Sequence, residues 1–217
     1  MTGAQAPLEV AGIVLAAGTS TRLEAEIPKQ LLRLDRLPLI AHVTQATVAS
    51  RLREVVVVVG HAAAEVTQAV AGYDVRTVEN PDYRTGQSSS VRTGLRAIDP
   101  RAEAALFLQA DQPLITPQLI DQLLVTYRKS GGPIVVPTYA GRRSSPALFD
   151  RRLFHELEQL TGDVGGRRIM ARNPSRVLEL PVDNPLELED VDTFADLERL
   201  ANAAGLTADE RVREHDA

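Results

Sequence analysis

VAGIVLAAGTSTR, residues 10–22, joins a short apolar segment to a loop of small and polar residues. Residues 10–15 have the length and the continuous hydrophobicity of a buried strand. The loop that follows offers backbone N–H groups that no strand partner uses, and such groups can close around an anion. Ala16, Ala17 and Gly18 carry almost no side chain, so a phosphate can approach the main chain closely. The stretch therefore predicts a buried strand that ends in a phosphate-binding loop.

Two cations follow this loop, Arg22 and Lys29, and both are close enough in sequence to reach the same anion. Of the 24 basic residues of the chain only Lys29 and Lys129 are lysines. A lysine brings a compact, mobile ammonium in place of the planar guanidinium used elsewhere in the chain. The spacing matches neither a Walker A loop nor the G-x-G-x-x-G fingerprint. We interpret the loop as a triphosphate site, and the alternative is an ordinary strand-to-helix turn with solvated cations.

Strand-like and helix-like segments alternate along the chain. Residues 55–59 are five consecutive valines, which is typical of a central parallel strand buried on both faces. Residues 104–110 form a second apolar run, and residues 75–78, 133–137 and 177–180 are shorter ones. Helices are expected at residues 38–50, 62–71, 87–98, 116–130, 150–160 and 193–202. This alternation predicts an α/β fold, a Rossmann-like three-layer αβα sandwich with a mostly parallel sheet.

Asp111 directly follows the apolar run at residues 104–110. The carboxyl end of a central parallel strand is where ligands bind in open α/β sheets. A Mg²⁺ ion that also binds substrate phosphates needs one or two protein carboxylates. Asp111 is therefore the main candidate for a metal ligand, and the alternative is that it caps the turn before Pro113.

Gln87, Ser88, Ser89 and Ser90 open the helix expected at residues 87–98. Serines at a helix start are common caps, and capping alone would explain them. A helix N-terminus with additional hydroxyl groups is also suited to bind a phosphate or a nucleobase. The segment is therefore a second candidate contact for a nucleotide.

The bulk composition excludes several classes of function. A net charge of −5 and a pI near 5.4 argue against a nucleic-acid groove. The absence of cysteine excludes disulfides and thiolate metal sites. No run approaches the ~20 apolar residues of a membrane span, and residues 1–9 lack a signal-peptide pattern, so we expect a cytoplasmic protein. The length favours a single domain over residues 1–205 with a polar C-terminal tail at 206–217.

The loop after the first strand resembles the signature of the MobA-like nucleotidyltransferases, and it is most similar to the branch of molybdenum-cofactor cytidylyltransferases. The resemblance is carried by Leu15-Ala16-Ala17-Gly18-x-Ser20-x-Arg22 with Lys29 downstream. Two further blocks match, one from Asn80-Pro81 to Gly94-Leu95 and one at Ala110-Asp111-Gln112-Pro113. The resemblance covers residues 13–200 and implies the fold of the nucleotide-diphospho-sugar transferases.

The resemblance implies a Mg²⁺-dependent enzyme that transfers CMP from CTP to a phosphorylated acceptor, molybdopterin, and releases pyrophosphate. Ala16-Ala17-Gly18 is similar to the branch that uses CTP rather than GTP. Catalytic roles fall to Arg22, Lys29 and Asp111, and the metal falls to Asp111 and Asp192, with Asp190 in reserve. The implied nucleotide contacts are Leu15, Ala16, Ala17, Gly18, Ser20, Arg22, Lys29, Gln87, Ser88, Ser90 and Asp111. A molybdoenzyme or its maturation factor is the implied protein partner, and neither nucleic acid nor membrane is expected.

Two departures from the family pattern keep other functions open. Glu24 stands where family members carry Gly, and the long loop before Lys29 is similar to the spacing in methylerythritol-phosphate cytidylyltransferases. Ser144 and Ser145 stand where the family has Gly and His or Asn on the acceptor side. The alternatives are a cytidylyltransferase for another phosphorylated metabolite, a nicotinamide-dependent oxidoreductase that reuses the fold, and a non-catalytic nucleotide-binding partner of a molybdoenzyme.

Overall fold

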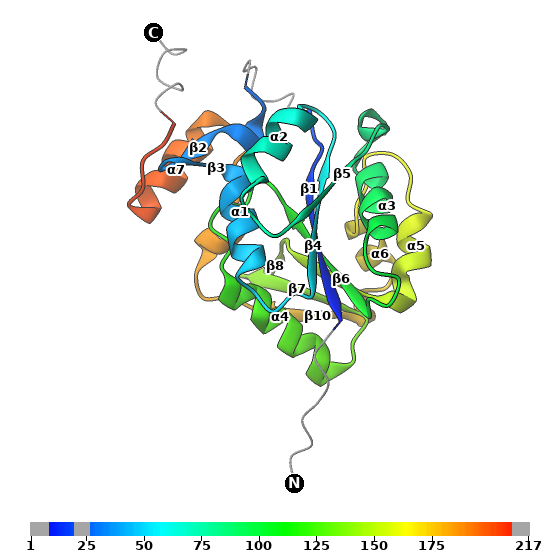
Figure 1. Ribbon diagram of the computed structural model, residues 1–217. Helices are drawn as coiled ribbons and strands as arrows, with labels where there is room; N and C mark the ends of the chain where they lie inside the picture. Colours follow the sequence, from blue (N-terminus) through cyan, green and yellow to red (C-terminus); the bar gives the residue numbers. More distant parts are fainter. Residues whose placement is uncertain (1–8, 20–26, 210–217) are drawn as a thin grey trace.

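The computed structural model describes residues 9–19 and 27–209, and an eight-stranded sheet forms its centre (Figure 1). The strand order is β10-β7-β9-β6-β1-β4-β5, and β8 pairs with β7 outside this path. The strands are β1 (Val10–Ala16), β4 (Glu54–Val59), β5 (Arg76–Glu79), β6 (Ala104–Gln109), β7 (Ile134–Tyr139), β8 (Arg142–Arg143), β9 (Ala147–Asp150) and β10 (Val177–Pro181).

The sheet is mostly parallel, as the alternation of segments predicts. β1 pairs in parallel with β4 and β6, β4 pairs in parallel with β5, and β10 pairs in parallel with β7. β9 runs antiparallel to both β6 and β7, because the chain turns back after β7 through the short strand β8. The carboxyl ends of β1, β4, β5 and β6 consequently meet at one edge of the sheet.

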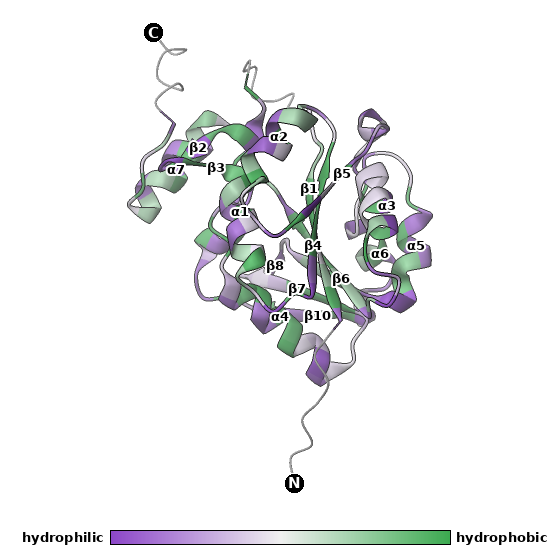
Figure 2. Ribbon diagram, in the orientation of Figure 1, coloured by the Kyte–Doolittle hydropathy of each residue, from purple (hydrophilic) through white to green (hydrophobic). Residues whose placement is uncertain are grey.

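The valine strand β4 is buried on both faces. Val55, Val57 and Val59 pack into one hydrophobic core, and Val56 and Val58 pack into a second core on the other face. This alternation follows from the two-residue period of a strand. Figure 2 shows that the central strands are mainly hydrophobic, whereas the covering helices combine hydrophobic and hydrophilic residues.

Helices cover both faces of the sheet, so the predicted three-layer αβα architecture is confirmed. α1 (Leu39–Val48), α2 (Ala63–Val70) and α4 (Pro117–Ser130) pack into the first core. α3 (Gln87–Ala97), α5 (Phe154–Glu158) and α6 (Arg167–Arg172) pack into the second core and lie together on one side in Figure 1. None of the helices in the described ranges is long and apolar enough to cross a membrane.

A third hydrophobic cluster lies outside the sheet, where α7 (Phe194–Ala204) packs on a small hairpin. The hairpin consists of β2 (Arg33–Leu34) and β3 (Leu37–Pro38) and follows the short 3₁₀ helix η1 (Lys29–Leu31). The cluster joins the segment around the hairpin to the C-terminal part of the described chain. Its buried members are Leu32, Leu34, Leu39, Val191, Leu197, Leu200 and Ala201. Figure 1 shows α7 beside β2 and β3, away from the sheet.

The segment after α7 departs from the expected tail. Thr207 O accepts a hydrogen bond from Asp35 N at 2.5 Å, and Ala208 forms a β-bridge with Leu34. Asp209 is buried and its Oδ2 accepts from Arg33 N at 3.0 Å. Residues 206–209 are thus part of the third cluster, and residues 210–217 of the expected tail lie outside the described residues.

Several element boundaries differ from the sequence prediction, and two of the differences have a clear structural cause. The helix expected at residues 150–160 is replaced by the end of β9, a 3₁₀ turn (Arg151–Leu153) and the short helix α5. Asp150 stays in the sheet because its N–H donates to Pro133 O at 2.8 Å. The helix expected from residue 38 begins at Leu39, because Pro38 is paired with Arg33 in the hairpin.

Gly94 allows α3 to approach the sheet, and this close contact gives a stability prediction. A Cβ at Gly94 would lie 2.4 Å from Ile13 Cγ2 and 3.2 Å from Val58 Cγ2, both in the second core. We expect Gly94→Ala to lower the free energy of unfolding by about 1–3 kcal/mol in a denaturant titration. Gly72→Ala is the matched control, since nothing lies within 4 Å of its added Cβ. Equal stability of the two variants would contradict this packing.

Candidate functional site

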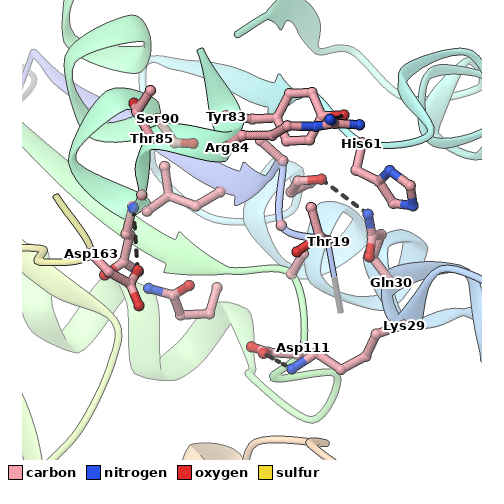
Figure 3. A pocket seen from close by; sticks show the side chains of 18 of the residues that line it. Thr19, Lys29, Gln30, His61, Tyr83, Arg84, Thr85, Ser90, Asp111 and Asp163 are labelled. Carbon is pink, nitrogen blue, oxygen red and sulfur yellow. Dashed lines mark hydrogen bonds and ion pairs between the residues drawn. The ribbon is translucent and has the colours of Figure 1, made fainter. Parts of the chain in front are cut away.

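A cavity of about 810 Å³ lies at the carboxyl ends of β1, β4 and β6 (Figure 3). This is the edge of a parallel sheet at which ligands of open α/β folds bind. The loop after β1 lines one wall, and the start of α3 lines the opposite wall. The lining residues are Leu15, Ala16, Ala17, Gly18, Thr19, Lys29, Gln30, His61, Tyr83, Arg84, Thr85, Gly86, Gln87, Ser90, Gln109, Ala110, Asp111, Asp163 and Asp192.

The loop after β1 is fixed by contacts with its neighbours. Ala17 O accepts from His61 N at 3.3 Å, and Ala16 O accepts from the side chain of the buried Gln30 at 3.2 Å. Gly18 and Thr19 are exposed at the cavity rim. The predicted contacts Leu15, Ala16, Ala17 and Gly18 therefore line one cavity wall. Ser20 and Arg22, which the sequence also assigns to this loop, lie outside the described residues.

Lys29 joins the two predicted metal ligands. Its Nζ donates to Asp111 Oδ2 at 2.6 Å and to Asp192 Oδ1 at 2.8 Å (Figure 3 shows the first of these contacts). Burial alone would lower the pKa of Lys29, but the charges and hydrogen bonds of the two carboxylates outweigh it and raise that pKa. The ammonium is therefore held in its charged form. Residues from three distant parts of the chain meet here.

Asp111 retains an unused ligand atom. Its Oδ1 is buried and has no hydrogen-bond partner. A buried carboxylate oxygen without a partner is costly, and it suits a hard cation that prefers oxygen ligands. In the described parts of the chain no three His, Asp or Glu side chains are grouped closely enough to hold a metal by themselves. The donor set fits a divalent cation that takes its remaining ligands from water and substrate phosphates.

Asp190, the reserve ligand, adds a third carboxylate to this region. Partial burial of its carboxyl, followed by the negative charges of Asp111 and Asp192, raises its pKa to about 6. A hydrogen bond with Gln112 and the charge of Lys29 act in the opposite direction. Gln112 is buried and also donates to Leu188 O at 3.1 Å, so it fixes the segment that carries these acids. The neighbourhood is one in which added negative charge is unfavourable and a cation is favourable.

The start of α3 presents only part of the predicted set to the cavity. Gln87 and Ser90 line it, because residues three apart lie on the same helix face. Ser88 is buried on another face, and its Oγ has no hydrogen-bond partner. Ser88 is thus not brought together with the other predicted nucleotide contacts.

Asn80 organises this wall and was not identified from the sequence. It is buried after β5, and its Nδ2 donates to Ser89 Oγ at 2.8 Å and to Ser90 Oγ at 3.0 Å. Its Oδ1 accepts from Asp82 N at 3.1 Å. Asn80 opens one of the sequence blocks that carry the family resemblance, but the sequence assigned no role in the site to it.

Three further residues that the sequence did not assign to the site, His61, Tyr83 and Arg84, form the outer rim of the cavity. The His61 and Tyr83 rings lie 6.2 Å apart, and the Arg84 guanidinium carbon lies 5.6 Å from the centre of the Tyr83 ring. Gly60 permits this arrangement, because a Cβ there would lie 2.8 Å from Tyr83 Cβ. An aromatic rim of this kind offers stacking surfaces for a planar ligand group.

A second cavity, also of about 810 Å³, adjoins the first. The two share Leu15, Gln87, Gln109, Asp111, Asp163 and Asp192 among their lining residues. The second cavity combines three arginines, Arg143, Arg167 and Arg168, with apolar side chains from β6, β9 and α6. The loop before α6, which contributes Asp163 to both cavities, lies close to the start of α3, since a Cβ at Gly86 would lie 2.4 Å from Gly162 C. The candidate metal ligands thus lie at the junction of two ligand-sized cavities.

A mostly parallel sheet between two helical layers, with two joined cavities at its carboxyl edge, defines a three-layer α/β protein that binds its ligands at that edge. The sequence model of the MobA-like NTP transferase domain family matches residues 12–177 of the chain. The chain therefore belongs to the family of MobA-like NTP transferase domains, and it is a nucleotidyltransferase-type protein, as its N-terminal loop predicts.

Solved structures share this fold over most of the chain. Rv0371c from Mycobacterium tuberculosis H37Rv is 30% identical, with a TM-score of 0.79 over 90% of this chain and 99% of that chain. The same protein has been solved in complex with manganese. A nucleotidyl transferase from Methanothermobacter, Mth528, is 23% identical with a TM-score of 0.78 over 90% of this chain and 97% of that one, which shows the common fold.

Curated relatives match a shorter part of the chain. The bifunctional protein GlmU of Sorangium cellulosum is 37% identical over 139 residues, which is 61% of this chain. The match spans 29% of the length of that GlmU protein. The similarity thus concerns one portion of a larger protein.

The contacts of Asn80 predict a large effect of its removal. Asn80→Ala leaves the Ser89 and Ser90 hydroxyls and Asp82 N without this partner. We expect the free energy of unfolding to fall by about 1–3 kcal/mol in a denaturant titration. Asn202→Ala, at an exposed position of α7, is the control and should change stability little. A neutral Asn80→Ala would mean that the wall of the cavity does not depend on this side chain.

Proposed function

We propose that the protein transfers a cytidylyl group from CTP to a phosphorylated acceptor, with molybdopterin as the favoured acceptor, and releases pyrophosphate. One observation carries the proposal: Asp111 and Asp192 line both cavities, and both accept hydrogen bonds from the ammonium of Lys29. A reaction between a nucleoside triphosphate in one cavity and an acceptor in the other would take place at this junction. The membership of the MobA-like family supports the same reaction class.

The bonds that change follow from this arrangement. An acceptor phosphate oxygen attacks the α-phosphorus of CTP, and the bond from that phosphorus to the oxygen bridging the α- and β-phosphates breaks. Pyrophosphate leaves with the electron pair of that bond. A phosphomonoester with a second pKa of about 6 is already ionised at neutral pH, so the step needs no protein base. The absence of a catalytic histidine from the proposed scheme is consistent with this chemistry.

The chain's own residues would bind and orient the reactants. The backbone of residues 16–18 would approach the phosphates, as small residues permit. Lys29 would neutralise charge on the leaving pyrophosphate, and Arg22 is assigned the same task from the sequence. Asp111 and Asp192 would hold a divalent cation, Mg²⁺ in our proposal, which when bound supplies charge neutralisation on the phosphates. A metal complex of the related Rv0371c is in keeping with such a site.

The choice of CTP and of the acceptor rests on chemistry at the two cavities. Ala16-Ala17-Gly18 is similar to the loop of the cytidylyl-using branch, and Gln87 and Ser90 offer polar groups to a base. The second cavity offers the cations Arg143, Arg167 and Arg168 to an anionic acceptor, and an apolar floor to the rest of it. The CMP:2-keto-3-deoxy-manno-octonic acid synthetase, solved in complex with CTP, shares the fold alone, at 16% identity and a TM-score of 0.70.

We further propose that residues 1–205 work as one domain. The third hydrophobic cluster ties the hairpin of β2 and β3 to α7, so an early and a late segment of this range support the same site. A molybdoenzyme or its maturation factor would receive the product if molybdopterin is the acceptor.

A pyrophosphate-release assay tests the proposed reaction. Purified protein with Mg²⁺, CTP and molybdopterin should release pyrophosphate faster than with GTP or ATP, and chelation of the metal should stop the release. Replacing molybdopterin with other phosphorylated metabolites tests the acceptor separately. Nucleotidyl transfer would be contradicted if no pair of nucleotide and acceptor released pyrophosphate and the protein instead oxidised a reduced nicotinamide cofactor.

Asp111→Asn should lower the rate of this reaction by at least about a hundredfold, because it removes a charged ligand at the reacting phosphates. Its folding should be retained, which a thermal melt would check. Asp74→Asn, at an exposed position that lines neither cavity, is the matched control and should react like the natural protein. An active Asp111→Asn would remove Asp111 from the proposed metal site.

A further inference from the structure

The Lys29 ammonium occupies the space between the two carboxylates that are proposed to hold the metal. The distances of 2.6 Å to Asp111 Oδ2 and 2.8 Å to Asp192 Oδ1 are those of charge-assisted hydrogen bonds. The Lys29 side chain is only 16% exposed, against 22% for Asp111 and 44% for Asp192. The Lys29 and Asp111 ends of this cluster are therefore largely shielded from solvent, whereas the Asp192 side chain is partly exposed.

We propose that Lys29 is the resident cation of the metal site and that the divalent metal enters by exchange with its ammonium. In the nucleotide-free protein the ammonium neutralises Asp111 and Asp192. When a triphosphate binds, its oxygens would accept hydrogen bonds from the ammonium, and the carboxylates of Asp111 and Asp192 would then be available to hold the metal. This inference rests on the proposed function, because it assumes that the first cavity receives a nucleoside triphosphate.

Competition for the same oxygen atoms carries the inference. Asp111 Oδ2 and Asp192 Oδ1 are engaged by Lys29, whereas the buried Asp111 Oδ1 has no hydrogen-bond partner. A divalent ion that binds both carboxylates would lie next to the ammonium, and two cations at such separations repel strongly. Metal binding without nucleotide therefore requires the Lys29 ammonium to give up its hydrogen bonds to Asp111 and Asp192 and to bind water in their place. Nucleotide phosphates offer it replacement partners, so each ligand should favour binding of the other.

The third hydrophobic cluster explains why the side chain, and not the backbone, makes the exchange. η1, which begins at Lys29, continues into the hairpin, and the segment with Asp192 continues into α7. The hairpin and α7 pack together in that cluster, and Asp209 Oδ2 accepts from Arg33 N. The backbone positions of Lys29 and Asp192 are thereby fixed relative to each other. The flexible four-carbon stem of lysine is the part that can turn toward Gly18 across the cavity.

Lys29 also has a competing role as a permanent structural tie. In that role it would keep Asp111 and Asp192 in place both with and without metal, and its removal would weaken metal binding. Exchange predicts the opposite sign, because removal of the resident cation leaves two carboxylates without their countercharge. The two roles are therefore distinguished by whether removal of the Lys29 side chain raises or lowers the affinity of the site for the metal.

Binding of Mn²⁺ alone, measured by electron paramagnetic resonance of the free ion, tests the exchange. We expect Lys29→Met to bind Mn²⁺ more tightly than the natural protein without nucleotide, by a factor on the order of ten. A non-hydrolysable CTP analogue, with its own Mn²⁺ binding subtracted, should strengthen Mn²⁺ binding by the natural protein and have a smaller effect on Lys29→Met. Lys129→Met, which changes the other lysine of the chain at an exposed position of α4, should behave like the natural protein.

Further variants keep the result interpretable. Lys29→Arg retains the positive charge and should not show the gain, and Lys29→Met with Asp111→Asn should lose it. A thermal melt of each variant establishes that it is folded. The exchange would be overturned if Lys29→Met bound Mn²⁺ no more tightly than the natural protein does. If Lys29→Met does not fold, a folded Lys29→Gln takes its place in this comparison. A gain in Mn²⁺ affinity without pyrophosphate release from any substrate would instead leave the exchange in place and contradict the proposed reaction.

Discussion

Two carboxylates held close together need a cation between them, and this requirement governs the site. Asp111 and Asp192 are placed at one point by the fold, and Lys29 satisfies their charge at 2.6 and 2.8 Å. The neighbouring Asp190, whose pKa is raised to about 6, shows how strongly this region resists further negative charge. A bound triphosphate would add several negative charges, so the site requires both the ammonium and a metal during the proposed reaction.

The fold supplies this arrangement from three independent parts. The parallel strands β1 and β6 bring the small-residue loop and Asp111 to the same edge of the sheet. The 3₁₀ turn at Lys29 and the segment before α7 reach the same edge because the third hydrophobic cluster packs them together. The two cavities meet where these parts converge, with Asp111 and Asp192 at their junction. In the proposed reaction a nucleotide and an acceptor would lie on either side of these carboxylates. Stability of the small cluster around α7 is thus directly linked to the geometry of the site.

The central fold could be predicted from the sequence because its signals are local. The five valines of β4 indicate a strand buried on both faces, and the position of Asp111 after β6 indicates the sheet edge. The contacts of Lys29 span 82 and 163 residues, and no local periodicity reports on such pairs. The role of Asn80 was missed for another reason, because it depends on side-chain hydrogen bonds across a loop to Ser89 and Ser90, which no periodicity reports. Ser88 was assigned with Gln87 and Ser90 from the family resemblance, and in the structure it is buried and does not line the first cavity.

The most direct test of the account is a crystal structure with Mn²⁺ and a non-hydrolysable CTP analogue, in which anomalous scattering locates the metal. The account predicts one anomalous peak between the carboxyl groups of Asp111 and Asp192, with Lys29 Nζ bonded to the phosphates of the analogue. An anomalous peak elsewhere, or a Lys29 that still bridges the two carboxylates beside a bound nucleotide, would contradict it.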